Sequence, residues 1–148
     1  MHIYILGIRA DDVTYDEALS IIESFIEEGT PHQIVTVNPE FVIAARKDPG
    51  FREIINNAAL VLPDGVGLLW ASRFLGRPLR ERVTGVDTVE RFAALAARKG
   101  YRPFFLGAAP GVAERAAEIL ARRYPGFSVA GTYAGSPAPE EEDEIVEL

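Results

Sequence analysis

Short apolar runs alternate with amphipathic stretches along this chain, and the alternation predicts strands that are each followed by helices. Continuous or alternating apolar residues of strand length occupy residues 3–8, 33–37, 60–62, 102–106 and 127–132. Five strands separated by helices predict an α/β fold. We expect a Rossmann-like, mostly parallel sheet with helices on both faces.

The helices are marked by their capping residues. Thr14 with Glu17 three residues later forms a capping box, and Asn38 and Asp48 each precede a proline that suits the first turn of a helix. Further helices are predicted after Asp64, over residues 87–99 and over residues 112–124. Leu69 and Trp70 belong to the helix after Asp64, and we expect both to be core residues rather than lipid contacts.

Composition indicates one domain. The 148 residues are 48% hydrophobic and 25% charged, and they include no cysteine, which excludes disulfides and thiolate metal sites. The opening strand lacks the basic flank of a signal peptide, and no apolar run approaches the roughly 20 residues of a membrane span. We therefore expect a cytoplasmic protein whose single domain fills residues 1–148.

The net charge of −7 is concentrated near the end of the sequence. Residues 140–147 supply six of the 22 acidic residues, which leaves 15 basic and 16 acidic residues, a net charge of −1, in residues 1–139. Nucleic-acid binding through a basic surface is therefore disfavoured. Pro139 followed by carboxylates predicts a helix start, and an apolar face then begins at Ile145, Val146 and Leu148. A helix that stops there predicts a truncated domain; a solvated acidic tail is the alternative.

Three predicted strand ends carry polar or glycine-rich turns: Thr36 to Asn38, Pro63-Asp64-Gly65, and Gly107-Ala108. Parallel strands place these turns at one edge of the sheet, where helix amino termini offer unpaired N–H groups to a phosphate. Each turn also has an ordinary structural interpretation, since Asp-Gly is a common turn and Asn before Pro is a common cap.

Arginine is frequent between residues 73 and 91, and we single out Arg82 because it lies in a predicted turn, where its planar guanidinium could hold a phosphate. No His or Asp pair has metal-ligand spacing, and no Asp-x-Asp triplet occurs. We therefore expect no cofactor and no divalent metal requirement.

Four blocks together resemble the WecG/TagA/CpsF family of glycosyltransferases: Thr36-x-Asn38-x-Glu40, Pro63-Asp64-Gly65-x-Gly67, Glu81-Arg82-x-x-Gly85-x-Asp87 and Phe105-Leu106-Gly107-Ala108. The resemblance implies an inverting transfer of N-acetylmannosamine or a related hexose. The donor would be a UDP-sugar and the acceptor a polyprenyl-diphosphate-linked sugar, at the inner membrane face, in cell-envelope polysaccharide or teichoic acid synthesis.

The resemblance also implies residue roles. Asp64 would be the catalytic base. The substrate would be bound by Thr36, Asn38, Gly65, Arg82 and Asp87. The nucleotide would be bound by Gly107, Ala108, Gly131, Tyr133 and Gly135.

Two family features, a Gly-x-Pro-x-Gln-Glu block and a basic membrane-contacting carboxyl-terminal segment, are absent from these residues. The resemblance therefore implies a fragment that holds the base and part of the nucleotide site, whose membrane contact would come from the missing segment. Oligomeric state stays open, a homo-oligomer included.

Two other function classes remain. A nucleotide-dependent oxidoreductase or methyltransferase should carry a glycine fingerprint in the first strand-to-helix turn, where this chain has residues 7–11, Gly-Ile-Arg-Ala-Asp. A non-catalytic nucleotide-binding domain would need no base at Asp64.

Overall fold

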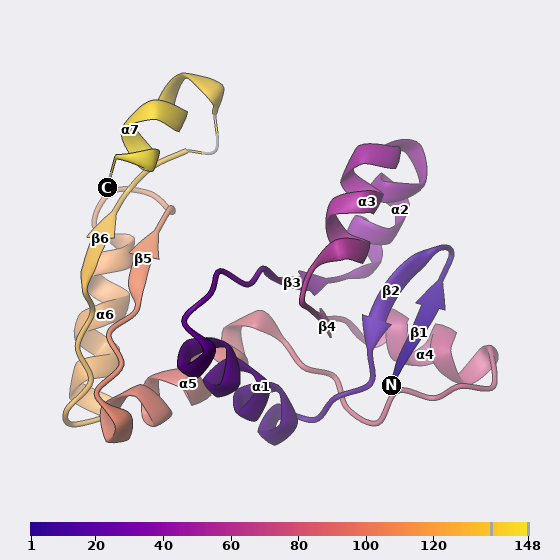
Figure 1. Cartoon of the computed structure of the whole chain (residues 1–148), viewed down its shortest axis with the longest axis horizontal. Coiled ribbons are helices and arrows are strands. Elements are labelled where there is room, and N and C mark those ends of the chain that lie inside the picture. The colour runs from indigo at the N-terminus through magenta and orange to yellow at the C-terminus, as the bar shows by residue number, and fades with distance from the viewer. Residues whose placement is uncertain (137, 148) are drawn as a thin grey trace. The chain divides into compact units, whose positions relative to one another are not determined.

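The computed structural model describes residues 1–136 and 138–147, and it divides into two compact units. The first unit is Met1–Val89 and the second is Glu90–Leu148 (Figure 1). Each unit combines helices with a pair of parallel strands. The described elements therefore have the mixed helix and strand content that the sequence predicts.

The chain begins with an antiparallel β-hairpin, where the apolar pattern predicts one strand over residues 3–8. β1 (His2–Ile5) pairs with β2 (Ile8–Asp11). Leu6 and Gly7 form the two-residue turn, with φ values of 51° and 83°. The prediction of a single strand is wrong because such turns are recognised by Asn or Asp at their first position, and leucine gives no such signal.

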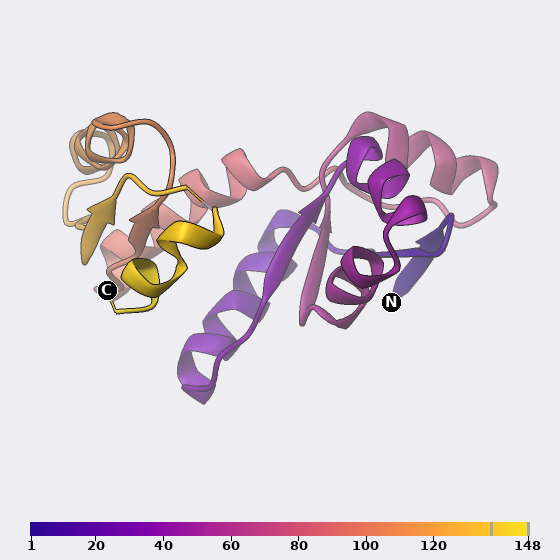
Figure 2. The same ribbon diagram turned by 90° about the horizontal axis from the view of Figure 1, so that it is seen from above.

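A strand–helix–helix–strand crossover follows in the first unit. β3 (Ile34–Val37) and β4 (Leu60–Pro63) pair in parallel and lie side by side in Figure 2. They are connected by α2 (Pro39–Lys47) and α3 (Pro49–Asn57). Both strands and both helices are confirmed. The parallel pairing brings the carboxyl ends of β3 and β4 to the same edge.

The predicted capping box is present at the start of α1 (Tyr15–Glu28). The Thr14 hydroxyl accepts from the Glu17 backbone N–H at 3.3 Å, and the Glu17 carboxylate accepts from the Thr14 N–H at 2.9 Å. Gly29 ends the helix in the left-handed region, with φ at 72°. Local signals thus fix both ends of α1.

The helix α4 (Val66–Phe74) is confirmed, but the expectation of a buried Trp70 is wrong, because its side chain is 70% exposed. Leu68 and Ser72 face the interior instead, and Leu69 is half-buried against the core. α4 buries only one side, and residues four apart share a side of a helix. Trp70, two positions after Leu68 and two before Ser72, consequently lies on the outer side.

The second unit contains most of α5 (Gly85–Lys99) and a second parallel pair. β5 (Phe104–Leu106) pairs with β6 (Gly131–Tyr133), and α6 (Val112–Arg123) connects them (Figures 1 and 2). The strand predicted over residues 127–132 overlaps β6 only in its last two residues. Its first residue, Phe127, is buried in the core of this unit instead.

The acidic segment forms a helical start, as predicted. Pro139 opens the 3₁₀ helix η1 (Pro139–Glu141), which continues into α7 (Glu142–Val146). Leu148, which belongs to the same prediction, lies outside the described residues.

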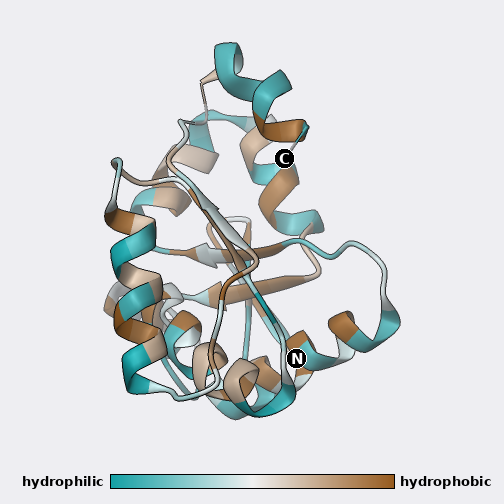
Figure 3. Cartoon of the chain, turned by 90° about the vertical axis from the view of Figure 1, so that its left-hand side faces the viewer, coloured by the Kyte–Doolittle hydropathy of each residue, from teal (hydrophilic) through white to brown (hydrophobic). Residues whose placement is uncertain are grey.

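Within residues 1–136 and 138–147, the strands form three two-stranded pairs, two of them parallel and one antiparallel. Hydrophilic and hydrophobic residues alternate along the helices (Figure 3). In the first unit, Asp11 is 5% exposed, and its carboxylate accepts from Val61 N–H at 2.8 Å and from Arg9 Nε at 2.8 Å. This carboxylate holds β2 against β4. Over the described ranges, no helix combines the length and apolar character needed to cross a bilayer.

Candidate functional site

Asp64 occupies the carboxyl end of β4, directly after Pro63. Its N–H donates to the Val37 carbonyl at 2.8 Å, which continues the β3–β4 pairing by one residue. One carboxylate oxygen, Oδ2, accepts from the Gly85 N–H at 3.0 Å. In the part of the chain that the structure describes, no other donor reaches this half-buried carboxylate. Oδ1 is thus left available to accept a proton.

Thr36 and Asn38 lie at the same edge. Thr36 is opposite Leu62 in the strand register, and a Cβ placed on Gly85 would lie 3.1 Å from Thr36 Cγ2. Asn38 caps α2, because its Oδ1 accepts from the Phe41 N–H at 2.9 Å. The ordinary interpretation of Asn38 as a helix cap is therefore correct. Its amide NH₂ group retains the capacity to donate to a ligand.

The glycines after Asp64 allow α2 and α4 to approach closely. A Cβ on Gly65 would lie 2.8 Å from Pro39 Cδ, and a Cβ on Gly67 would lie 2.8 Å from Pro39 Cγ. Gly65 also has a φ of 155°, which disfavours other residues. The first two sequence blocks therefore fit one another sterically. This fit sets the position of Asn38 relative to Asp64.

The turn that carries Arg82 runs along the end of β4. Val83 N–H donates to the Pro63 carbonyl at 3.0 Å, and Val83 itself is fully buried. Arg82 is exposed, and over the described ranges it makes no ion pair or hydrogen bond. An exposed guanidinium of this kind can engage an anion without first breaking an internal ion pair.

Tyr15 completes this part of the site, and it was not among the predicted site residues. Its hydroxyl accepts from Thr84 N–H at 3.0 Å and donates to Asp87 Oδ2 at 3.0 Å. Its own N–H donates to Glu81 Oε2 at 2.9 Å. Tyr15 thus fixes the turn whose Gly85 N–H holds Asp64. Nothing in the local sequence indicates contacts that span about 70 positions.

The structure brings five predicted residues of the first unit to one edge or to the turn beside it: Asp64, Gly65, Thr36, Asn38 and Arg82. Asp87 is also close, in the first turn of α5, but its carboxylate is engaged by Tyr15. A carboxylate, an amide and an exposed arginine at this edge or in the turn beside it are groups of the kind that can serve proton transfer beside an anionic group.

The second unit has its own glycine-rich turn between β5 and α6. Gly107, Ala108 and Gly111 have φ values of 105°, 66° and 84°. Gly111 is the N-cap of α6 and supplies no side-chain cap. Positive φ values before an uncapped helix start are typical of phosphate-binding turns, but here the Gly107 N–H donates to the Tyr133 carbonyl at 2.8 Å and the Val112 N–H to the Ala109 carbonyl at 3.1 Å. A phosphate-binding role for Gly107 and Ala108 stays a prediction.

The remaining predicted residues of this unit are defined by packing. A Cβ on Gly131 would lie 2.7 Å from Phe104 Cε2, and a Cβ on Gly135 would lie 2.7 Å from Tyr133 Cε1. A hydrogen bond to Glu144 raises the pKa of Tyr133, and burial adds to the effect. These contacts explain both glycines sterically. A nucleotide-binding role for the three residues stays a prediction.

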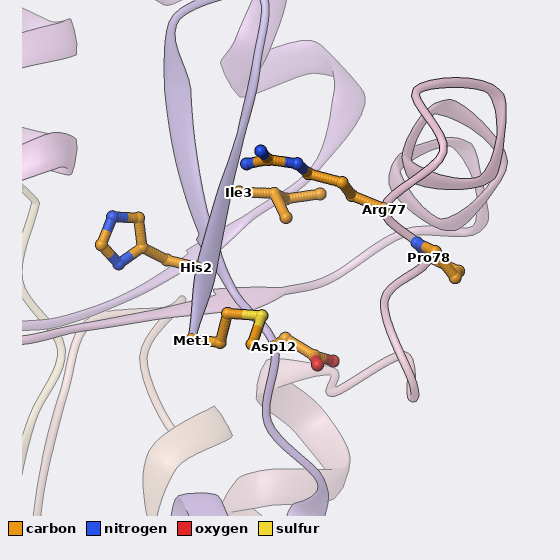
Figure 4. A pocket seen from close by; sticks show the side chains of 6 residues that line it. All are labelled: Met1, His2, Ile3, Asp12, Arg77 and Pro78. Atoms are coloured by element: carbon orange, nitrogen blue, oxygen red, sulfur yellow. The ribbon is translucent and has the colours of Figure 1, made fainter.

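A surface hollow elsewhere in the first unit is lined by Met1, His2, Ile3, Asp12, Arg77 and Pro78 (Figure 4). The Arg77 side chain extends over Ile3, whereas the His2 side chain points away from Ile3. Asp12 is engaged by Arg80, whose Nε donates to Asp12 Oδ2 at 3.0 Å. The hollow contains none of the predicted site residues. Among described residues, no group of three or more His, Asp or Glu side chains could hold a metal ion.

The sequence was also compared with known proteins. The sequence model of the "Glycosyl transferase WecG/TagA/CpsF family" matches residues 3–148. The chain is 33% identical over 108 residues to the N-acetylglucosaminyldiphosphoundecaprenol N-acetyl-beta-D-mannosaminyltransferase of Bacillus spizizenii, which covers 73% of this chain and 42% of that protein.

A protein of the same name from Staphylococcus aureus (strain NCTC 8325) is 34% identical over 128 residues, which covers 85% of this chain and 50% of that protein. The chain therefore spans about half the length of the curated relatives it matches.

Proposed function

The chain belongs to the WecG/TagA/CpsF glycosyltransferase family, and we propose from this premise that it transfers N-acetylmannosamine or a related hexose from a UDP-sugar to a polyprenyl-diphosphate-linked sugar. The product would serve cell-envelope polysaccharide or teichoic acid synthesis. The names of its relatives support the acceptor class. The single observation that carries the catalytic part is Asp64, held by one oxygen at the edge shared by Thr36, Asn38 and the Arg82 turn.

The proposed step is an inverting displacement. The acceptor hydroxyl oxygen attacks the anomeric carbon of the donor sugar, and the bond between that carbon and the diphosphate oxygen breaks. The hydroxyl proton passes to Asp64 Oδ1, while UDP leaves with the bonding electron pair. The Gly85 N–H keeps Oδ2 fixed, so that Oδ1 is oriented for the proton.

The departing diphosphate carries the charge that the enzyme must stabilise. We assign that role to Arg82, and assign substrate contacts to Thr36, Asn38, Gly65 and Asp87. The nucleotide is assigned to Gly107, Ala108, Gly131, Tyr133 and Gly135. The assignment of Gly107 and Ala108 is supported by their positive φ values in the turn before α6.

We also propose a Rossmann-like fold class, with residues 1–148 belonging to one transferase domain. Each unit contains a crossover between parallel strands, and one family model spans nearly the whole chain. A lipid-linked acceptor implies action at the inner face of the cell membrane, where we place the protein as a peripheral enzyme.

The test is UDP release by the protein encoded by the whole gene, with a panel of UDP-sugars and a short-chain polyprenyl-diphosphate-linked sugar. Asp64→Asn should abolish acceptor-dependent release. Asp48→Asn is the matched control, because Asp48 caps α3 through Oδ1 at 3.0 Å from Phe51 N, and Asn caps equally well. Equal release by wild type and Asp64→Asn would refute the base assignment. A metal chelator should leave the rate of UDP release unchanged. Release that is lost with chelator and restored by manganese would refute a metal-free reaction.

A non-catalytic nucleotide-binding domain is the second candidate, favoured by the uncapped start of α6, which needs no base nearby to hold a phosphate. In that case UDP would bind, and Asp64→Asn would leave its binding unchanged, with no transfer by either protein. An oxidoreductase or methyltransferase is disfavoured, because its glycine fingerprint is expected in a strand-to-helix turn. Residues 7–11 instead form a hairpin turn and β2.

A further inference from the structure

The outer side of α4 carries an apolar stripe that no described residue covers. Val66, Trp70 and Phe74 are 52%, 70% and 94% exposed. Their spacing of four residues places them along one side of the helix. Exposed aromatic residues in such a row are uncommon on a protein surface unless something binds there.

The stripe is held outward by a firmly packed opposite side. Leu68 and Ser72 are buried, and Ser72 Oγ accepts from the Leu79 N–H at 3.0 Å. Gly67 packs on the ring of Pro39. α4 therefore cannot roll to bury Trp70 and Phe74 without losing these contacts.

The charges in the segment that carries the stripe are of one sign. Residues 66–80 include Arg73, Arg77 and Arg80 and no Asp or Glu. Arg73 and Arg77 are exposed, and among the residues described neither forms an ion pair. Arg80 by contrast is occupied by Asp12 and Glu17. Arg73 directly precedes Phe74 on α4, whereas Arg77 follows the helix and its side chain extends over Ile3 (Figure 4). Two free guanidinium groups near this end of the stripe complement an anionic, partly apolar surface.

We propose that the stripe Val66–Trp70–Phe74 docks into the interfacial region of an anionic phospholipid bilayer, with Arg73 and Arg77 at the headgroup phosphates. A helix of nine residues is about 14 Å long and can only lie in the membrane plane. Tryptophan is well suited to that depth, because its ring is apolar and its N–H is polar.

The position of the stripe gives this docking a purpose, which rests on the proposed function. α4 begins two residues after Asp64, so docking α4 brings the carboxylate to the surface from which a lipid-linked acceptor presents its sugar. The docking site is distinct from the carboxyl-terminal segment that the family resemblance implies.

The test uses Trp70 as its own probe, because it is the only tryptophan of the chain. Vesicles of phosphatidylglycerol and phosphatidylcholine should shift its emission to the blue, and brominated acyl chains should quench it. Pure phosphatidylcholine vesicles and high salt should both weaken the effect. Phe74→Ser retains the probe and should lower partitioning by about tenfold. Ile54→Ser, which removes a 53% exposed apolar residue from α3, should not.

Several outcomes would overturn the proposal. One is an unshifted Trp70 spectrum on phosphatidylglycerol vesicles. Another is vesicle binding that Phe74→Ser and an Arg73→Glu, Arg77→Glu double variant leave intact. A concentration-dependent blue shift without vesicles would identify a second copy as the occupant. A shift caused by a short soluble polyprenyl diphosphate alone would identify the acceptor tail. None of these measurements depends on sugar transfer. A failure of membrane docking is therefore distinguishable from a failure of the proposed transferase activity, which the UDP-release assay measures.

Discussion

The steric fit between Gly67 and Pro39 predicts that Gly67→Ala destabilises the protein, although alanine is the better helix former. Gly67 is the second residue of α4, and an added methyl would lie 2.8 Å from Pro39 Cγ, against about 3.5–4.0 Å for a normal carbon contact. The proline ring is fixed at the first position of α2 and cannot rotate away. Such overpacking costs about 1–3 kcal/mol, whereas the gain in helix propensity is at most about 1 kcal/mol.

The matched control is Gly50→Ala, at the second position of α3. There the nearest atom to an added Cβ is Asp48 Oδ1 at 3.4 Å, so the methyl fits with little adjustment. Gly50→Ala should therefore gain up to about 1 kcal/mol from the reduced freedom of the unfolded chain. The two variants make the same chemical change at equivalent helix positions. We expect their free energies of unfolding to differ by about 2 kcal/mol, with Gly67→Ala the less stable.

Urea unfolding followed by circular dichroism measures this difference, and a thermal midpoint supports it. For a chain of 148 residues, 1 kcal/mol corresponds to a shift of about 2–4 °C. Equal stability of the two variants, or a more stable Gly67→Ala, would refute the claim that Pro39 and Gly67 are in enforced contact. It would also remove the steric reason for the pairing of the first two sequence blocks.

Two further predictions concern polar contacts. Tyr15→Phe leaves the buried Thr84 N–H without its acceptor and should lower the free energy of urea unfolding by about 1–3 kcal/mol. Tyr4→Phe, the control at a 53% exposed residue, should leave that free energy almost unchanged. Equal losses in the two variants would contradict the role of the Tyr15 hydroxyl. The hydrogen bond from Arg80 lowers the pKa of Glu17 below 4.5. This pair therefore stabilises the fold above pH 4.5, and its contribution is lost as the pH falls through the lowered pKa. Arg80→Met should raise the midpoint of the Glu17 carboxyl NMR titration, and an unchanged midpoint would argue against the pair.

The sequence predicted much of the candidate site because the relevant signals are local. Asp64 follows a short apolar run and precedes glycine, which places it at a strand end without knowledge of any distant residue. Asn38 and the Thr14 capping box are likewise defined within three positions of the backbone groups they bind. The family resemblance added roles for these residues but no contacts.

The tertiary structure decided what depends on residues far apart in the chain. Gly65 must be glycine because Pro39 approaches it, and Tyr15 matters because Thr84 and Asp87 lie beside its hydroxyl. These contacts join positions that no periodic pattern relates. The hairpin turn at Leu6 was missed for a local reason instead, since leucine adopts a positive φ there although it is not one of the residues that mark such turns.

Trp70 marks the boundary between the two kinds of information. The sequence alone determined that it lies on a helix, because helical periodicity and the strand-end turn before it are local properties. Whether its ring is buried depends on which side of α4 meets the rest of the unit, and Leu68 and Ser72 occupy that side. Local patterns thus determined the elements and the position of Asp64. Packing between distant segments determined which side chains face inward and which surface remains to bind a partner.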